Sequence, residues 1–389
     1  MRKFKILVVA PYLSFPSESG SNRFIFLVNI LKKKYDVTLV TSLFHHKSKT
    51  VRNFNPVIEG VKVVLIDEPG YSKNIDLKRI NSHYIFCKNF VNFLDKNIFQ
   101  YDLVYSAYPL IKTNYILGQL KNKYNFKFII DVQDVWPEAI TGAIPILSST
   151  LGSYLLKPVS YYANRTYSYA DALIAVSKTY LNRANVNHLP EDLAKAVYIG
   201  ANGVPLINYQ NNNDKVRAVY LGTLGESYDL ETIIRAAAIC RDDAEFIIVG
   251  TGPKEDYLKK LNQQLGGYVK FLGSLKYSDA IEVVKSSDIA LNAIKDSAQQ
   301  SITNKLSDYF YCNKPIFSSQ TNKEVMELLS RGGGINYLAG DYEELARLVL
   351  SINKDQLQRM SEVNRLIYKE SFYRPESYKA ILQLIEELI

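Results

Sequence analysis

Short runs of β-branched and other apolar residues alternate with segments of helical periodicity along most of the chain. Apolar runs of this kind are typical of parallel strands covered on both faces. The first half contains expected strands at Lys5–Ala10, Val37–Thr41, Val61–Ile66, Leu103–Tyr105, Phe126–Asp131 and Ala172–Val176. The second half contains them at Val216–Leu221, Glu245–Val249, Tyr268–Leu272, Ile289–Asn292 and Pro315–Ser318. The pattern predicts an α/β protein built from two doubly wound, Rossmann-like domains.

The alternation breaks near the middle of the chain. Gly, Asn-Gly and Pro between residues 198 and 205 mark a turn, and the polar run 208–214 has no periodicity. A chain of 389 residues also exceeds what one hydrophobic core usually organises. We therefore expect domains at 1–200 and 201–374. Residues 375–389 begin at a proline and predict an amphipathic helix, which we expect to pack back on the N-terminal domain.

Charge is divided unequally between these halves. The net charge is +8, with +11 in residues 1–200 and −3 in the remainder. A basic surface can attract nucleic acid, an anionic membrane or an acidic substrate. Here lysines and arginines lie among many aromatic residues, as in 154–169, a segment that could rest on the inner membrane surface, and no nucleic-acid partner is expected. The alternative is that 154–169 is an ordinary packed helix.

Other compositional features limit the possible classes. No apolar stretch approaches the roughly 20 residues of a membrane helix, so the expected location is cytoplasmic, with peripheral association at the membrane as an option. The three cysteines lack CxxC spacing and are expected to be buried. His45 and His46 are expected on a surface loop, and no metal site is expected.

The first strand–loop–helix unit tests whether the protein binds a dinucleotide. Its loop has no GxGxxG motif, and the next strand ends in Thr41-Ser42 instead of an acidic residue. These departures disfavour an NAD-dependent dehydrogenase. The backbone of Gly20, just before the helix, could still approach an anion; the alternative is a plain βα turn.

Glycine-bearing turns follow several expected strands of the second half. Gly222, Thr223 and Gly225 follow one strand, Gly252 follows the next, and Leu275 follows the third. In open α/β sheets ligands bind at the carboxyl ends of strands, and glycines allow the backbone to approach them closely. Each turn alone is a weak signal, but together they predict a nucleotide site.

The segment 303–310 reads as a helix start with Thr303 as its cap. Asn304, Lys305 and Asp308 then share a face. A lysine can neutralise a diphosphate, and a carboxylate one turn later can accept both hydroxyls of a ribose. The alternative is an exposed salt bridge between positions three residues apart, which stabilises a helix by only a few tenths of a kcal/mol.

An acidic group follows the strand 126–131 and consists of Asp131, Asp134 and Glu138. One of these carboxylates could position or deprotonate an acceptor hydroxyl, and we favour Asp134. The alternative is that Asp131 binds backbone at the strand end and that Glu138 pairs with a basic neighbour.

In this order the motifs resemble glycosyltransferase family 4, a family of mostly retaining enzymes with the GT-B fold. The resemblance is most specific at residues 131–138 (DVQDVWPE) and 304–309 (NKLSDY), which look like segments of the capsule, O-antigen and exopolysaccharide subgroup. It implies that Asp308 binds the ribose, Lys305 the diphosphate, the 222–225 turn the phosphates and Leu275 the base. It implies an acceptor near Asp134 and Glu138.

Two motifs depart from the family pattern. The paired acidic motif E-x7-E reads Gln300-x7-Asp308, and the phosphate-binding Arg and Lys are replaced by Thr223 and Tyr228. An amide at 300 would meet a donor sugar hydroxyl in place of a carboxylate. The same changes would also suit a GT-B protein that has lost its activity.

The resemblance implies a retaining, metal-independent hexosyltransferase without a cofactor, with its donor bound by the C-terminal domain in a cleft that the two domains face. Its substrates would be a nucleoside-diphosphate sugar and a saccharide acceptor, linked to a polyprenyl diphosphate, in surface polysaccharide biosynthesis. A catalytically silent partner or glycan-binding protein is the first alternative. A sugar-nucleotide epimerase is the second.

Overall fold

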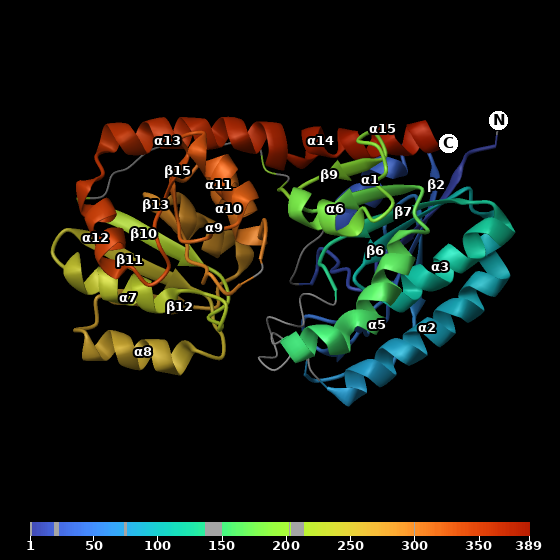
Figure 1. Cartoon of the computed structure of the whole chain (residues 1–389), viewed down its shortest axis with the longest axis horizontal. Coiled ribbons are helices and arrows are strands. Elements are labelled where there is room, and N and C mark those ends of the chain that lie inside the picture. The colour runs from blue at the N-terminus through green and yellow to red at the C-terminus, as the bar shows by residue number, and fades with distance from the viewer. Residues whose placement is uncertain are drawn as a thin grey trace. The chain divides into compact units, whose positions relative to one another are not determined.

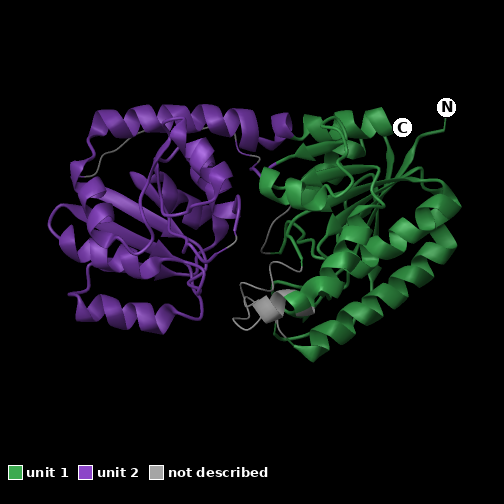
Figure 2. Cartoon of the chain, in the orientation of Figure 1, with its two compact units in different colours: residues 1–197, 378–389 green, residues 198–377 purple. Residues whose placement is uncertain are grey.

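The computed structural model describes residues 2–18, 23–73, 76–136, 150–201, 203, 214–298 and 300–389 (Figure 1). The chain divides into two compact units, formed by residues 1–197 with 378–389 and by residues 198–377 (Figure 2). Each unit has its own parallel sheet and its own cores, which confirms the expected α/β class.

Unit 1 contains a seven-stranded parallel sheet of order β5-β2-β1-β6-β7-β8-β9. Its strands are β1 (Lys5–Val9), β2 (Asp36–Ser42), β5 (Val61–Ile66), β6 (Leu103–Tyr108), β7 (Lys127–Val132), β8 (Ala172–Ala175) and β9 (Ala194–Ala196). A small antiparallel hairpin, β3 (Phe44–His45) with β4 (Thr50–Val51), follows β2. The strand order reverses between β1 and β6, so the carboxyl ends of these two strands flank the switch point where doubly wound sheets bind ligands.

Helices cover both faces of this sheet. They are α1 (Arg23–Leu31), α2 (Leu77–Asn97), η1 (Ile98–Gln100), α3 (Ile111–Tyr124), α5 (Thr150–Tyr167), α6 (Lys178–Ala184) and α15 (Lys379–Leu388). Helices α2, α3 and α5 lie on one face (Figure 1), against alternate residues such as Leu7 and Val9. Helices α1 and α15 bury their apolar stripes on the other face, against Ile6 and Val8. The C-terminal helix therefore completes the core of the N-terminal unit.

Unit 2 contains a six-stranded parallel sheet of order β12-β11-β10-β13-β14-β15. Its strands are β10 (Val216–Leu221), β11 (Ala244–Val249), β12 (Val269–Gly273), β13 (Ile289–Asn292), β14 (Ile316–Ser318) and β15 (Gly334–Asn336). The order reverses between β10 and β13, which places the switch point of this sheet at their carboxyl ends.

The helices of unit 2 again form two layers. They are α7 (Leu230–Ile239), α8 (Glu255–Gln264), α9 (Tyr277–Lys285), α10 (Asn304–Tyr311), α11 (Lys323–Ser330), α12 (Tyr342–Ser351), α13 (Lys354–Ile367), η3 (Tyr368–Phe372) and α14 (Arg374–Ser377). Helices α7, α8 and α12 pack on one face of the sheet, and α9, α10 and α11 pack on the other. The loops that follow the strands lie at the carboxyl edge of the sheet.

Every strand expected from the sequence is present, with ends shifted by a few residues, whereas the short strands β3, β4, β9 and β15 were not anticipated. The three cysteines are buried free thiols, as expected. The expectation for His45 was wrong, because this residue lies in β3 and is buried against Ser14. Within the described residues, no helix has the length and apolar character needed to cross a membrane.

Candidate functional site

The loops that follow β10 and β11 meet at the carboxyl edge of the unit 2 sheet, and glycines allow that contact. A Cβ on Gly250 would lie 1.8 Å from the carbonyl oxygen of Gly222, and one on Gly252 would lie 2.4 Å from that of Leu224. Backbone bonds from Gly222 to Val249 (2.9 Å) and from Leu224 to Thr251 (3.0 Å) join the two loops. The glycines expected to contact a ligand therefore also hold the strand ends together.

Tyr309 fixes helix α10 on the switch point. Its hydroxyl accepts a hydrogen bond from the Leu221 amide at the end of β10 (2.9 Å) and donates one to the Leu291 carbonyl of β13 (3.1 Å). The side chain is fully buried. Because one hydroxyl joins the two strands that flank the switch point, the first turn of α10 is held at the place where a ligand is expected.

Lys305 projects from this first turn into a cage of two tyrosines. Its Nζ atom lies 4.3 Å from the ring centroid of Tyr220 and 3.8 Å from that of Tyr228, and it donates a 3.0 Å hydrogen bond to the Tyr220 hydroxyl. A Cβ on Gly222 would lie 3.2 Å from the same nitrogen. Burial lowers the pKa of Lys305 well below its ordinary value. The cationic side chain thus lies beside the glycine turn, and the alternative of an exposed salt bridge with Asp308 is wrong.

Asp308 lies one turn further along α10 and is hydrogen-bonded by a neighbouring tyrosine. The Tyr277 hydroxyl donates to its Oδ1 atom at 2.7 Å. Burial raises the pKa of Asp308 to about 6, while the Tyr277 hydrogen bond and the charge of Arg374 act in the opposite direction. A hydroxyl therefore already occupies one oxygen of the carboxylate that is expected to bind ribose hydroxyls.

Three side-chain oxygens near α10 are buried without a hydrogen-bond partner among the described residues: Gln300 Oε1, Thr303 Oγ1 and Ser307 Oγ. Thr303 occupies the N-cap position of α10, but its side chain makes no capping bond, so the expected cap is wrong in this detail. An unsatisfied buried polar atom costs about 1–3 kcal/mol. Polar groups left in this condition at a switch point are what a site for a polar ligand would contain.

The remaining expected donor residues are spread around this centre. Thr223 and Asn304 are exposed, whereas Gly225 and Gly252 are partly exposed in their turns. Leu275 is half-buried and packs against the core beneath α9. No group of three or more acidic, histidine or cysteine side chains that could hold a metal occurs in the described parts of the chain.

In unit 1 a small cavity of about 160 Å³ lies at the switch point between β1 and β6. Residues from the ends of both strands line it, with Arg23 and Gln133 as its charged and amide side chains. Arg23 forms a buried, two-pronged ion pair with Asp131, with N–O distances of 3.1 and 3.2 Å. Asp131 also accepts hydrogen bonds from Tyr105 (2.6 Å) and Gln133. Asp131 is therefore a structural anion with its oxygens already occupied.

Asp134 differs from Asp131 because it keeps capacity for a ligand. It is half-buried, and its Oδ1 atom accepts a hydrogen bond from the adjacent Val135 amide at 2.9 Å. Burial raises the pKa of Asp134, and hydrogen bonds that its carboxylate accepts from Val135 and Trp136 act in the opposite direction. Gly20 and Glu138, the other expected residues of this domain, lie outside the described residues.

Sequence reasoning did not identify Tyr220, Tyr277 or Arg23. Tyr220 offered one signal, because it is the one aromatic residue of β10, the strand that leads into the glycine turn. Tyr277 and Arg23 offered none, since their partners lie 31 and 108 residues away in the chain.

The chain is similar to known proteins both in sequence and in structure. Residues 215–355, most of unit 2, match the family described as Glycosyl transferases group 1. An uncharacterized glycosyltransferase of Methanocaldococcus jannaschii is 24% identical over 258 residues, which cover 61% of this chain and 65% of that protein. The chain thus spans just under two thirds of the length of this curated relative.

Solved structures match over nearly the whole chain. HepE of Anabaena in complex with UDP-glucose aligns with a TM-score of 0.63 and 18% identity, covering 99% of both chains. Sucrose-phosphate synthase of Thermosynechococcus elongatus aligns with a TM-score of 0.74 and 15% identity, again over 99% of both. The chain therefore has the fold of GT-B glycosyltransferases, and the family match to residues 215–355 supports a glycosyltransferase.

Proposed function

We propose that this chain is a retaining glycosyltransferase of family 4 that transfers a hexose or deoxyhexose from a nucleoside-diphosphate sugar to a saccharide linked to a polyprenyl diphosphate. One observation carries the proposal: α10 presents Lys305 and Asp308 at the switch point of unit 2, beside the turn of Gly222. A cation and a carboxylate one turn apart match the diphosphate and the ribose of such a donor. The bound UDP-glucose of a protein with the same fold is consistent with this chemistry.

In the proposed reaction, the leaving group is the nucleoside diphosphate. Lys305 moves from between Tyr220 and Tyr228 toward the diphosphate and stabilises its developing charge together with the amides of the 222–225 turn. Asp308 exchanges the Tyr277 hydroxyl for ribose hydroxyls, and Leu275 covers the base. Gln300, whose Oε1 atom has no partner among the described residues, binds a hydroxyl of the donor sugar. We propose no metal ion or cofactor in this step.

On the acceptor side we assign Asp134 to the acceptor hydroxyl. Its raised pKa suits a group that accepts a proton or hydrogen bond from a hydroxyl during transfer. Glu138 is assigned a supporting role in the same motif. The pathway we propose is synthesis of a bacterial surface polysaccharide, such as capsule or O-antigen.

For the acceptor to be lipid-linked, unit 1 should rest on the cytoplasmic face of the membrane, and its surface supports this. Tyr154 and Tyr161 of α5 are 60% and 69% exposed, and the Lys157 ammonium lies 4.0 Å from the Tyr154 ring centroid. On α2, three apolar side chains at helical spacing are exposed: Leu77, Ile80 and Tyr84. Rings and aliphatic groups beside lysines are typical of helices that lie at a lipid interface. Other tyrosines of 154–169, such as Tyr167, are core residues.

The test is transfer or hydrolysis with UDP-, GDP- and dTDP-sugars as donors. Wild type should consume one of these donors, and Asp308→Ala should bind and consume it at least about 10-fold less well, since a charged hydrogen-bonded pair is worth about 1.5–3 kcal/mol. Asp279→Ala, which removes an exposed carboxylate on α9, is the matched control. Equal activity of Asp308→Ala and wild type would remove Asp308 from the site.

The enclosure of Lys305 by two tyrosines also favours a second candidate, a catalytically silent GT-B partner that binds a glycan or a sister enzyme. In that case the caged lysine never reaches a diphosphate. Calorimetry with UDP, GDP and dTDP separates the two, because the silent partner should bind none of them and should co-purify with an active enzyme.

A further inference from the structure

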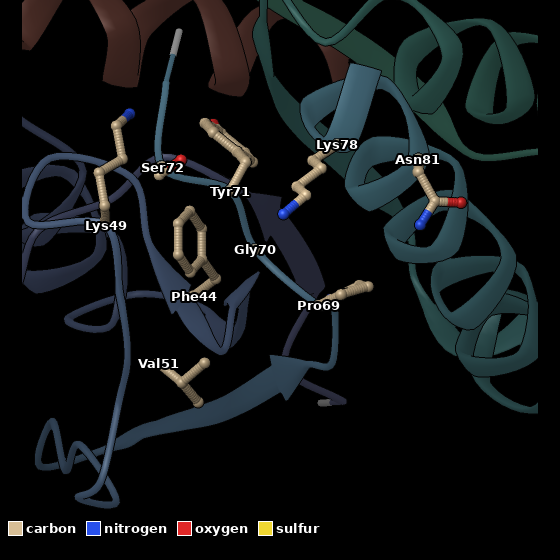
Figure 3. Close-up of a pocket in the computed structure, with 9 residues that line it drawn as sticks. All are labelled: Phe44, Lys49, Val51, Pro69, Gly70, Tyr71, Ser72, Lys78 and Asn81. Atoms are coloured by element: carbon tan, nitrogen blue, oxygen red, sulfur yellow. The ribbon is translucent and has the colours of Figure 1, made fainter. Parts of the chain in front are cut away.

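Unit 1 has a pocket of about 520 Å³ between the β3–β4 hairpin and the start of α2 (Figure 3). Its Lys49 ammonium lies 3.3 Å from His46 Nδ1. Among the described residues, none of the buried side-chain atoms that lack a hydrogen-bond partner belongs to its lining. Such atoms do occur beside α10 of unit 2, on Gln300, Thr303 and Ser307. The donor site of unit 2 is therefore the place where polar groups still need a ligand.

Asp308 of α10 is the carboxylate assigned to the pentose of the donor, and its two oxygens are in different conditions. The Tyr277 hydroxyl donates to Oδ1 at 2.7 Å. The Oδ2 atom accepts no hydrogen bond from the part of the chain that the structure describes. A sugar hydroxyl that approaches Asp308 therefore meets one open oxygen and one oxygen that already has a donor.

Both partners have the protonation state that this contact needs. Burial raises the pKa of Asp308 to about 6, so at pH 7 the carboxylate is ionised and its oxygens only accept. Burial, and then the charge of Asp308, raise the pKa of Tyr277 above its ordinary value, so its hydroxyl stays protonated and donates. A hydrogen bond to an ionised acceptor is about twice as strong as one between neutral groups.

The hydroxyl of Tyr277 holds this side chain at the site, and packing contributes little. Tyr277 is the first residue of α9 and is 61% exposed. The buried residues of α9 are Ala280, Ile281 and Val284, which share a core with α10. Shared packing of the two helices brings the start of α9 beside Asp308 in the second turn of α10. Removing the Tyr277 hydroxyl would therefore remove one contact and almost no buried surface.

Ribose and 2′-deoxyribose make different demands on this carboxylate. The adjacent 2′- and 3′-hydroxyls of a ribose need both oxygens of Asp308. With Tyr277 on Oδ1, a ribose either leaves one hydroxyl unpaired against the phenol ring or displaces Tyr277 and forfeits its hydrogen bond. In both cases the second hydroxyl brings no net gain, because an unmade or exchanged hydrogen bond adds nothing to affinity. A 2′-deoxyribose has one hydroxyl, which binds Oδ2 while Tyr277 keeps Oδ1.

We propose that Tyr277 is a specificity-determining residue of the donor site, whose hydroxyl takes the place of the 2′-hydroxyl and fits the site to a 2′-deoxyribonucleoside-diphosphate sugar. The inference rests on the proposed function for the presence of a nucleotide at α10 and for the role of Asp308. It narrows the donors named there, since dTDP-sugars contain 2′-deoxyribose and UDP- and GDP-sugars contain ribose.

The test is calorimetry on the full-length protein with UDP and 2′-deoxy-UDP, which differ by a single hydroxyl. A pH of about 8 keeps Asp308 ionised even when the hydrogen bond that lowers its pKa is lost. Wild type should bind 2′-deoxy-UDP at least as tightly as UDP. Tyr277→Phe should bind UDP about tenfold more tightly than 2′-deoxy-UDP, because only a ribose can then supply donors to both oxygens. Tyr257→Phe, which removes an exposed hydroxyl from α8, is the matched control and should keep the wild-type ratio.

The ratio of the two affinities separates specificity from a structural role. A merely structural contribution of Tyr277 would weaken UDP and 2′-deoxy-UDP equally in Tyr277→Phe, and that unchanged ratio would overturn the proposal. A wild type that binds UDP more than about threefold more tightly than 2′-deoxy-UDP would overturn it as well.

Failure of the proposed function has a different signature. If the ratio reverses in Tyr277→Phe but no nucleotide sugar is consumed, the transferase proposal fails and the assignment of Tyr277 stands. If a UDP-sugar is consumed faster than the dTDP-sugar and Tyr277→Phe leaves the ratio unchanged, the transferase stands and the assignment of Tyr277 fails. If neither nucleotide binds, both fail.

Discussion

Replacing Lys305 with methionine should make the protein more stable and a poorer binder of its donor. The substitution keeps the side-chain length and removes the ammonium from between Tyr220 and Tyr228, where it is 7% exposed. The Tyr220 hydroxyl keeps a partner, because it donates to the Thr223 carbonyl at 2.9 Å. Replacing buried charged groups by apolar ones of similar volume often stabilises a protein by about 1–4 kcal/mol. We expect a gain of about 1–2 kcal/mol at pH 7, because the rings already offset part of the desolvation.

The pH dependence identifies the cause of this gain. The pKa of Lys305 is lower in the folded protein than in the unfolded chain, where a lysine titrates near 10.4. Between these pKa values the unfolded chain binds more protons, so the stability of the wild type rises with pH. The difference between Lys305→Met and wild type should therefore shrink as the pH approaches about 10.

The measurements are urea unfolding at several pH values and calorimetry with the donor nucleotide. Loss of a charged contact to the diphosphate should weaken nucleotide binding by about 2 kcal/mol, roughly 30-fold. Lys260→Met, an exposed lysine of α8, should change neither quantity. If Lys305→Met destabilises the protein, or stabilises it by the same amount at every pH, then desolvation of the ammonium is not the cause. Unchanged nucleotide affinity would show that Lys305 stays between the tyrosines and does not bind the diphosphate.

Three further predictions concern single contacts. Because the pKa of Asp308 is about 6, UDP-glucose affinity measured by calorimetry should fall as the pH drops through 6. Asp308→Asn should abolish this pH dependence. If the dependence persists in Asp308→Asn, another group is the one that titrates. Asp131→Ala should lower the free energy of urea unfolding by about 3–5 kcal/mol, because Arg23 is left as a buried, uncompensated charge, and a loss below 1 kcal/mol would contradict this. Gly250→Ala should abolish nucleotide binding and lower the free energy of unfolding, because its Cβ would meet the Gly222 carbonyl. Gly267→Ala is the control: its Cβ would meet open space, and its φ of 79° should cost only about 1 kcal/mol of stability while nucleotide binding stays normal.

The sequence predicted most of the architecture because buried parallel strands are continuous apolar runs. It failed for β9 and β15, three-residue strands with the sequences Ala-Lys-Ala and Gly-Ile-Asn, which contain no such run. Their pairing depends on neighbouring strands that are distant in the chain. For short edge strands, tertiary contacts decide the structure and local pattern does not.

The candidate site was predictable as a set of residues but not as a set of contacts. Helical spacing places Asn304, Lys305 and Asp308 on one side of α10, yet Asn304 is exposed and Lys305 is buried. The difference comes from Tyr220 and Tyr228, which approach from β10 and its loop. The choice between Asp131 and Asp134 likewise depended on Arg23, whose distance of 108 residues leaves no local signal. Periodicity gives the direction of a side chain, whereas its burial and charge depend on elements that pack against it.

The tyrosines at this site bear on how such a protein would hold a diphosphate. Tyr228 and Thr223 stand where the resemblance to family 4 places basic residues, so the buried Lys305 is the cation that lies directly beside Gly222. A buried lysine between two rings is held close to its ligand at a desolvation cost, and a bound dianion would offset that cost. Binding a nucleoside diphosphate should then couple to protonation of Lys305, with uptake of a proton at high pH. A site with several exposed arginines would depend strongly on salt, because counterions screen exposed charges. Here the cation is buried, and nucleotide affinity should depend more on pH than on ionic strength.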